Sequence, residues 1–102
     1  MVRYFPDKQS YEEYHIAFNF FRLLAKGNDS ILTVEVKAYD ADDVDKTDVL
    51  TDVLMQVIES PRVYVWVKGG IVQRYKLTCK IITVGGKKWE MDGYQNVVED
   101  QT

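Results

Sequence analysis

The sequence predicts an all-β sandwich of six to seven antiparallel strands, and three observations support this prediction. Apolar and polar residues alternate with a period of two along several runs, most clearly from Arg62 to Tyr94. Glycine pairs at positions 69–70 and 85–86 interrupt that region, and glycine allows the positive φ values that tight reversals require. With 102 residues, 46% of them hydrophobic, the chain is long enough for one core and too short for two.

The N-terminal segment is expected to be a loosely held arm or a short edge strand, since residues 1–13 are mixed and mostly polar. The next run, Tyr14 to Phe20, alternates regularly and predicts the first strand, with Ile16 and every second residue after it on one face. Phe21 to Gly27 then breaks the alternation, which suits one helical or 3₁₀ turn that ends at the glycine.

Two further segments precede the glycine-rich region. Ile31 to Tyr39 alternates again and predicts a second strand, with Leu32 and every second residue after it facing inward. Thr47 to Ile58 is ambiguous. Its apolar residues recur at helical spacing, which favours an amphipathic helix, but its β-branched content and the following Pro61 equally suit a strand, a kink and another strand. We expect extended structure there.

The number and spacing of these strands are closer to an immunoglobulin or fibronectin type III architecture than to a barrel. We expect one sandwich domain over residues 14–98, preceded by the N-terminal arm (residues 1–13) and followed by a C-terminal tail over residues 99–102. Tyr75 lies at the start of a long strand, where such sandwiches often place a tyrosine whose hydroxyl bonds to the preceding backbone. The alternative is an ordinary core tyrosine.

The run from Arg62 to Val67 provides the candidate contact site. If its valines face the core, the pleat places Tyr64 and Trp66 on the outer side of the sheet, next to Lys68. Large aromatic residues dominate the binding energy of many interfaces, so we expect these three residues to contact another protein. The alternative is that the N-terminal arm or an edge loop covers the two aromatic side chains within the same molecule.

Residues 40–48 contain five aspartates and one lysine, which raises the question of a calcium site. An EF-hand loop needs glycine at its sixth position and glutamate at its twelfth. The segment contains no glycine, and the twelfth position counted from Asp40 or from Asp43 is Thr51 or Leu54. We therefore expect a solvated acidic turn, with no metal and no cofactor.

The residues show no catalytic constellation, so we expect a protein that is not an enzyme and has no catalytic residues. The one histidine, His15, lies on the polar side of its strand without a serine or cysteine placed to pair with it. The one cysteine, Cys79, lies on the apolar side of a strand, as a buried structural thiol does. No apolar run approaches the ~20 residues of a membrane span, so we expect a soluble protein without a membrane partner.

The alternative class of function is a nucleic-acid or oligosaccharide binding module. Residues 62–88 include seven basic and no acidic residues, and the neighbouring Tyr64 and Trp66 could stack on bases. The formal net charge of -3 opposes a general affinity for nucleic acid. Protein binding is therefore the preferred interpretation.

Six motifs extend over most of the chain: YxIxFNF from Tyr14, LxxG from Leu24, an alternating run from Ile31, VYVWVKGG from Val63, YKLTCKIIT from Tyr75 and GGKK from Gly85. Together they resemble the small immunoglobulin-like proteins of tailed bacteriophages and prophages, which are decoration (cement) or fiber-tail adaptor proteins. The resemblance implies a structural or adaptor protein that binds phage capsid or tail proteins, or further copies of itself. It also implies synthesis in the bacterial cytoplasm and a final place in the virion, with the station at head, neck, tail or fiber left open.

Overall fold

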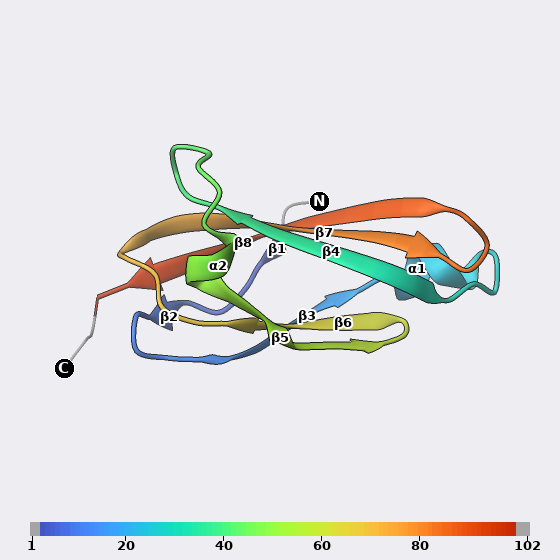
Figure 1. Ribbon diagram of the computed structural model, residues 1–102, viewed down its shortest axis with the longest axis horizontal. Helices are drawn as coiled ribbons and strands as arrows, with labels where there is room; N and C mark the ends of the chain where they lie inside the picture. Colours follow the sequence, from blue (N-terminus) through green and yellow to red (C-terminus); the bar gives the residue numbers. More distant parts are fainter. Residues whose placement is uncertain (1–2, 100–102) are drawn as a thin grey trace.

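The computed structural model describes residues 3–99 and consists of two β-sheets packed face to face, which confirms the predicted all-β sandwich (Figure 1). Residues 1–2 of the expected arm and 100–102 of the expected tail lie outside the described part of the chain. The strands are β1 (Arg3–Tyr4), β2 (Lys8–Gln9), β3 (Tyr14–Asn19), β4 (Ile31–Tyr39), β5 (Thr51–Glu59), β6 (Arg62–Val67), β7 (Gln73–Thr83) and β8 (Lys88–Val98). Two short helices, α1 (Phe21–Ala25) and α2 (Thr47–Leu50), connect them, and neither is long enough to cross a membrane.

The order of the six long strands is that of an immunoglobulin constant-type domain, whereas β1 and β2 pair with β8 rather than with β3. One sheet has the order β1-β8-β7-β4, with β2 also paired to β8, and the other has the order β3-β6-β5. If β3 to β8 are lettered B to G along the chain, the sheets contain the groups C-F-G and B-E-D that characterise this architecture. The six long strands pair antiparallel, whereas the two-residue strands β1 and β2 run parallel to β8.

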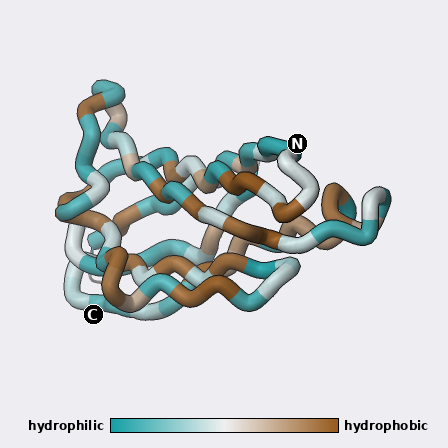
Figure 2. The backbone as a smooth tube through the Cα atoms, turned by 45° about the vertical axis from the view of Figure 1, so that its right-hand side comes forward, coloured by the Kyte–Doolittle hydropathy of each residue, from teal (hydrophilic) through white to brown (hydrophobic). Residues whose placement is uncertain are grey.

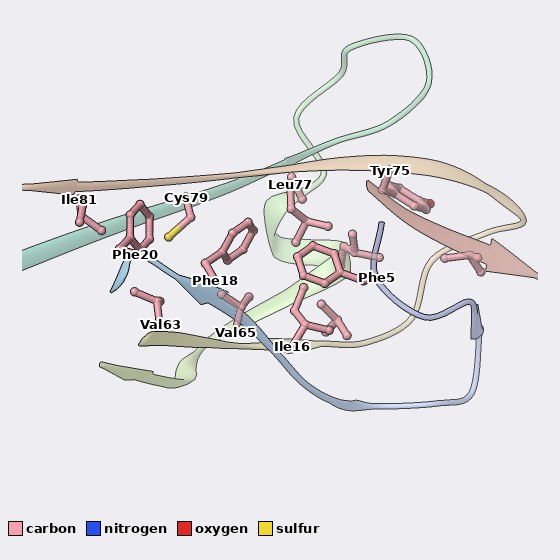
Figure 3. Packing of buried hydrophobic residues seen from close by; sticks show 14 of the residues in the cluster. Phe5, Ile16, Phe18, Phe20, Val63, Val65, Tyr75, Leu77, Cys79 and Ile81 are labelled. Atoms are coloured by element: carbon pink, nitrogen blue, oxygen red, sulfur yellow. The ribbon is translucent and has the colours of Figure 1, made fainter. Parts of the chain in front are cut away.

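The core lies between the inner faces of the two sheets (Figure 3). Every second residue of β7 from Tyr75 to Ile81 is at most 2% exposed, and Phe18 of β3 is fully buried. Phe5, from the segment between β1 and β2, meets Phe18 edge to face, with ring centroids 5.2 Å apart. Apolar stretches follow the strands in both layers (Figure 2), so the alternation read from the sequence corresponds to the two inner faces.

The N-terminal segment is anchored to the sandwich by a buried lysine. Lys8 is fully buried, and its Nζ donates a hydrogen bond of 2.6 Å to the backbone oxygen of Gly69 in the β6–β7 turn. Burial lowers the pKa of Lys8 by desolvation, and the nearby carboxylates of Glu12 and Glu13 act in the opposite direction. The turn itself depends on its glycines, since Gly69 and Gly70 have φ values of 52° and 92°.

Two details, one in the connection from β3 to β4 and one at the start of β4, differ from the prediction. Helix α1 forms as expected, but the left-handed residue after it is Asn28, with φ of 48°, rather than Gly27. Asparagine tolerates this conformation because its short polar side chain bonds locally. Leu32 was expected to face inward and is instead 60% exposed, because the pairing of β4 with β7 shifts register between Ile31 and Thr33.

Residues 47–58, whose sequence pattern was ambiguous, form both a helical turn and a strand. The expectation of extended structure is wrong for its first four residues, which form α2, and right for the remainder, which forms β5. Asp45 accepts hydrogen bonds from the Thr47 backbone N–H at 2.9 Å and from its hydroxyl at 2.6 Å, which fixes the start of the helical turn. The turn carries Leu50 into the core, where it is fully buried, and this tertiary contact outweighs the strand propensity of the segment.

Candidate protein-contact surface

The candidate surface is the outer face of the β3-β6-β5 sheet, and the alternation along β6 creates it. Val63, Val65 and Val67 are at most 2% exposed and face the core. Tyr64 and Trp66 lie between them, point to the opposite side and are half-buried. Both aromatic side chains therefore have the orientation expected from the sequence.

His15 joins these two residues into one cluster, which we call the aromatic face (His15, Tyr64 and Trp66). Its ring centroid lies 5.0 Å from that of Trp66 and 6.2 Å from that of Tyr64, edge to face in both cases. His15 Nε2 lies 2.8 Å from the carbonyl oxygen of Met55 on β5. A carbonyl oxygen only accepts hydrogen bonds, so Nε2 carries the proton.

The sequence alone gave His15 no role beyond that of a surface residue. Its partners become visible only when the strands are paired, since His15 on β3 lies opposite Trp66 on β6. Met55 is 40 positions away in the sequence, and the shift in pairing between β5 and β6 brings its carbonyl group within reach. Only a correct prediction of strand neighbours and register could have identified these contacts of His15 from the sequence.

The N-terminal segment contacts the aromatic face at one edge. Trp66 Nε1 donates a hydrogen bond of 3.1 Å to Glu13 Oε1, immediately before β3. Glu13 is exposed, and Tyr64 and Trp66 remain half-buried. The segment therefore fixes the orientation of the indole without covering the two rings.

Lys68 follows the last residue of β6 and is half-buried. Its backbone N–H donates a hydrogen bond of 2.7 Å to the carbonyl oxygen of Leu50, the last residue of α2. No ion pair within 4.0 Å involves its side chain among residues 3–99. Lys68 thus provides a cation at the end of the strand that carries Tyr64 and Trp66.

Three further basic residues of this region lie on the far side of the sandwich, whereas Arg62 is the exposed first residue of β6. Arg74, Lys76 and Lys80 occupy outward positions of β7, which belongs to the opposite sheet. Lys76 and Lys80 each lie 3.9 Å from a carboxylate of β8, and the Arg74 guanidinium stacks over two tyrosine rings. Binding of single-stranded nucleic acid combines cations and stacking rings along one groove. Here the three cations of β7 lie on the sheet opposite Tyr64 and Trp66, which leaves Arg62 and Lys68 at the two ends of β6.

The acidic loop between β4 and α2 projects from the body of the molecule (Figure 1) and uses its carboxylates locally. Asp40 Oδ1 accepts hydrogen bonds from the backbone N–H groups of Asp42 at 2.8 Å and Val44 at 3.0 Å. The Thr47 hydroxyl, followed by its backbone N–H, lowers the pKa of Asp45. These contacts are those of a turn stabilised by its own side chains.

Cys79, the one cysteine, is fully buried on the inner face of β7. Desolvation raises the pKa of its thiol to about 12, so the sulfur is protonated near neutral pH. A protonated, inaccessible thiol packs as a small apolar side chain. Cys79 belongs to the core and lies apart from the aromatic face.

Comparison with known protein families gives one match. The model of a family described as "Podophage GP4 fiber-tail adaptor protein gp77" matches residues 8–92. The matched region runs from β2 into β8 and contains strands β2 to β7 and the aromatic face. No curated protein matches the chain.

Proposed function

This chain belongs to the podophage GP4 fiber-tail adaptor family, and from that premise we propose that it links protein components of a phage tail through its aromatic face. Of the stations that the sequence left open, the family favours tail or fiber attachment over decoration of the head. The protein would be made in the cytoplasm of the bacterial host and become part of the virion. Its partners would be other tail proteins.

The observation that supports this use of the surface is the cluster of three ring side chains on one outer face. Tyr64 and Trp66 are partly accessible, and His15 orders both rings before a partner arrives. Tyrosine and tryptophan give large contact area at low cost in side-chain entropy, which is why they are frequent in the centre of interfaces. Lys68 at the end of the strand would then contribute to the polar rim.

The role would be one of binding without catalysis. The Cys79 thiol is buried and protonated, and His15 Nε2 is engaged with the backbone of Met55. Neither group is therefore presented as a nucleophile or a base. This supports the family-based interpretation of an adaptor that acts through contacts alone.

The test is the double variant Tyr64→Ser/Trp66→Ser, compared with Tyr4→Ser/Tyr94→Ser as a matched control. The control removes two stacked rings, with centroids 5.6 Å apart, from the outer face of the opposite sheet. Each variant is mixed with the purified tail proteins of the same phage, and complexes are measured by size-exclusion chromatography with light scattering.

We expect the first variant to lose complex formation and the control to keep it. Loss of the hydrogen bond between Trp66 and Glu13 should lower stability by only about 0.5–1.5 kcal/mol, so the first variant should still unfold cooperatively. Normal complex formation by a folded Tyr64→Ser/Trp66→Ser protein would refute the proposed surface. If the double variant is unfolded, the single variant Tyr64→Ser, which leaves the Trp66–Glu13 hydrogen bond in place, tests whether the surface binds tail proteins.

A further inference from the structure

One end of the sandwich presents apolar side chains among carboxylates, and we call it the acidic end. It consists of the β2–β3 turn, the acidic loop with α2, and the β6–β7 turn, each with one strand residue on either side (residues 9–14, 39–51 and 67–73) (Figure 1). These segments contain seven carboxylates and two lysines. Five of their large apolar or aromatic side chains are at least 50% exposed: Tyr11, Val44, Val49, Ile71 and Val72.

The opposite end, which we call the basic end, also presents apolar side chains. It consists of the connection through α1 and the β5–β6 and β7–β8 turns, again with one strand residue on either side (residues 19–31, 59–62 and 83–88) (Figure 1). These segments contain five cations and two carboxylates. Phe21 and Val84 are 60% and 65% exposed there. The composition of this end therefore complements that of the acidic end.

The charges of the two ends are not neutralised within the molecule. None of the five cations of the basic end forms an ion pair within 4.0 Å among residues 3–99, and of the seven carboxylates of the acidic end only Asp45 does. The long axis measures 47 Å, several times the Debye length of about 8 Å at physiological ionic strength, so neither end offsets the field of the other. Each end is therefore available to an oppositely charged surface.

We propose that the acidic end of one copy docks on the basic end of a second copy, so that the chains associate head to tail. Two acidic ends or two basic ends would repel each other, whereas unlike ends attract, and this complementarity selects a second copy in the same orientation. Such a contact is heterologous, so the series closes into a ring or continues as an open chain according to the rotation between neighbours. This inference goes beyond the proposed function, because it uses neither ring of the aromatic face.

The size of the contact leads us to expect a weak association that depends on salt. The cross-section perpendicular to the long axis is 25 × 24 Å, so a complete end-to-end contact buries about 1,200 Å² in total, at the lower limit for a stable interface. Salt screens the attraction between exposed charges. Sedimentation should therefore show reversible association at low ionic strength that weakens as NaCl is added.

Two charge-reversal variants test the two ends separately. Asp42→Lys/Asp48→Lys changes the acidic end and Lys26→Glu/Lys88→Glu changes the basic end, and all four side chains are exposed. Each variant should associate about ten-fold more weakly than the unmodified protein, since two side chains of the contact then face like charge. Thermal unfolding checks that each variant is folded, and the salt dependence of the unmodified protein tests the contact without any substitution.

A mixture of the two variants distinguishes a head-to-tail contact from a symmetric one. One variant keeps its basic end and the other keeps its acidic end, so together they should form a 1:1 dimer with the affinity of the unmodified contact and no larger species. The control Lys76→Glu/Lys80→Glu makes the same change in net charge as the basic-end variant, in the middle of β7. It should associate like the unmodified protein.

Several results would overturn the inference. One is an unmodified protein that stays monomeric at about 1 mM and low ionic strength, because that concentration half-populates a contact with a Kd of about 1 mM. Weakening in only one of the two end variants would indicate a symmetric contact through that end. Equal weakening in the β7 control would indicate an effect of net charge alone, and a mixture that forms no 1:1 dimer would exclude the pairing of unlike ends.

The Tyr64→Ser/Trp66→Ser variant separates this inference from the proposed function. It should self-associate like the unmodified protein, because neither ring belongs to the acidic or the basic end. Loss of self-association in that variant would place the contact on the aromatic face and refute the head-to-tail contact. Self-association that responds to the end variants as expected would stand even if Tyr64→Ser/Trp66→Ser bound tail proteins normally, a result that refutes only the proposed function.

Discussion

His15 on β3 and Met55 on β5 are joined by a hydrogen bond of 2.8 Å, although the whole of β6 lies between their strands. The imidazole extends over β6 beside Tyr64 and Trp66 and reaches the segment where β5 leaves regular register with its neighbour. One side chain thus orders the aromatic face and the exposed edge strand together.

Replacing His15 by phenylalanine tests this link, because the ring packing is kept and the hydrogen bond is lost. The free energy of unfolding should fall by about 0.5–1.5 kcal/mol. Hydrogen exchange of the amides at residues 53–57 should accelerate, since the Met55 carbonyl loses its partner. The amides of β8 serve as the internal control. Unchanged exchange in β5 would mean that the bond does not hold the segment.

Leu77→Ala should destabilise the protein by about 2–5 kcal/mol, because Leu77 is fully buried and its loss leaves a cavity between the sheets. Urea unfolding followed by tryptophan fluorescence gives the value. Leu54→Ala is the matched control, since Leu54 is 90% exposed, and should change stability by less than about 0.5 kcal/mol. Similar effects of the two substitutions would mean that the faces of the sheets are assigned incorrectly.

Tyr75→Phe should cost about 1–3 kcal/mol, although it removes a single oxygen atom. The Tyr75 hydroxyl oxygen accepts hydrogen bonds from the Ile71 backbone N–H at 3.0 Å and from Gln73 Nε2 at 3.2 Å. It ties the start of β7 to the preceding turn, as the tyrosine corner of immunoglobulin-like domains does. Tyr64→Phe, on the outer face, is the control for thermal unfolding. An equally small change in both variants would show that the corner bond is dispensable.

Asp29 should make the stability of the protein depend on pH in the acid range. The Thr83 hydroxyl, and then the backbone N–H groups of Gly85 and Ser30, lower its pKa from the usual 3.8. A carboxyl group with a lowered pKa in the folded state stabilises the protein above pH 3.8, and this contribution is lost as the pH falls through the folded-state pKa. Asp29→Asn should therefore lose less stability than the unmodified protein between pH 4 and pH 2 in urea titrations. Parallel pH profiles would contradict the assignment.

The alternation of residues predicted the strands whose inner faces are continuous. For β3, β6 and β7 it gave both the strand and its orientation, because burying one face leaves a period of two in the sequence. It gave the wrong orientation for Leu32, where the register shifts, and missed the helical turn at Thr47. Both depend on contacts with distant residues that no local pattern records.

The sequence by itself determined the two-layer β architecture, the buried faces of its central strands and the outward direction of Tyr64 and Trp66, because side-chain burial repeats with the pleat. Only the tertiary structure decided what lies beside those two rings. Strand order brings His15 against them and Met55 within reach of His15, and it leaves β5 at the edge of its sheet. It also separates the basic residues of β7 from the aromatic face by the thickness of the core. Neighbours across a sheet are set by topology and register, which join residues far apart in the chain.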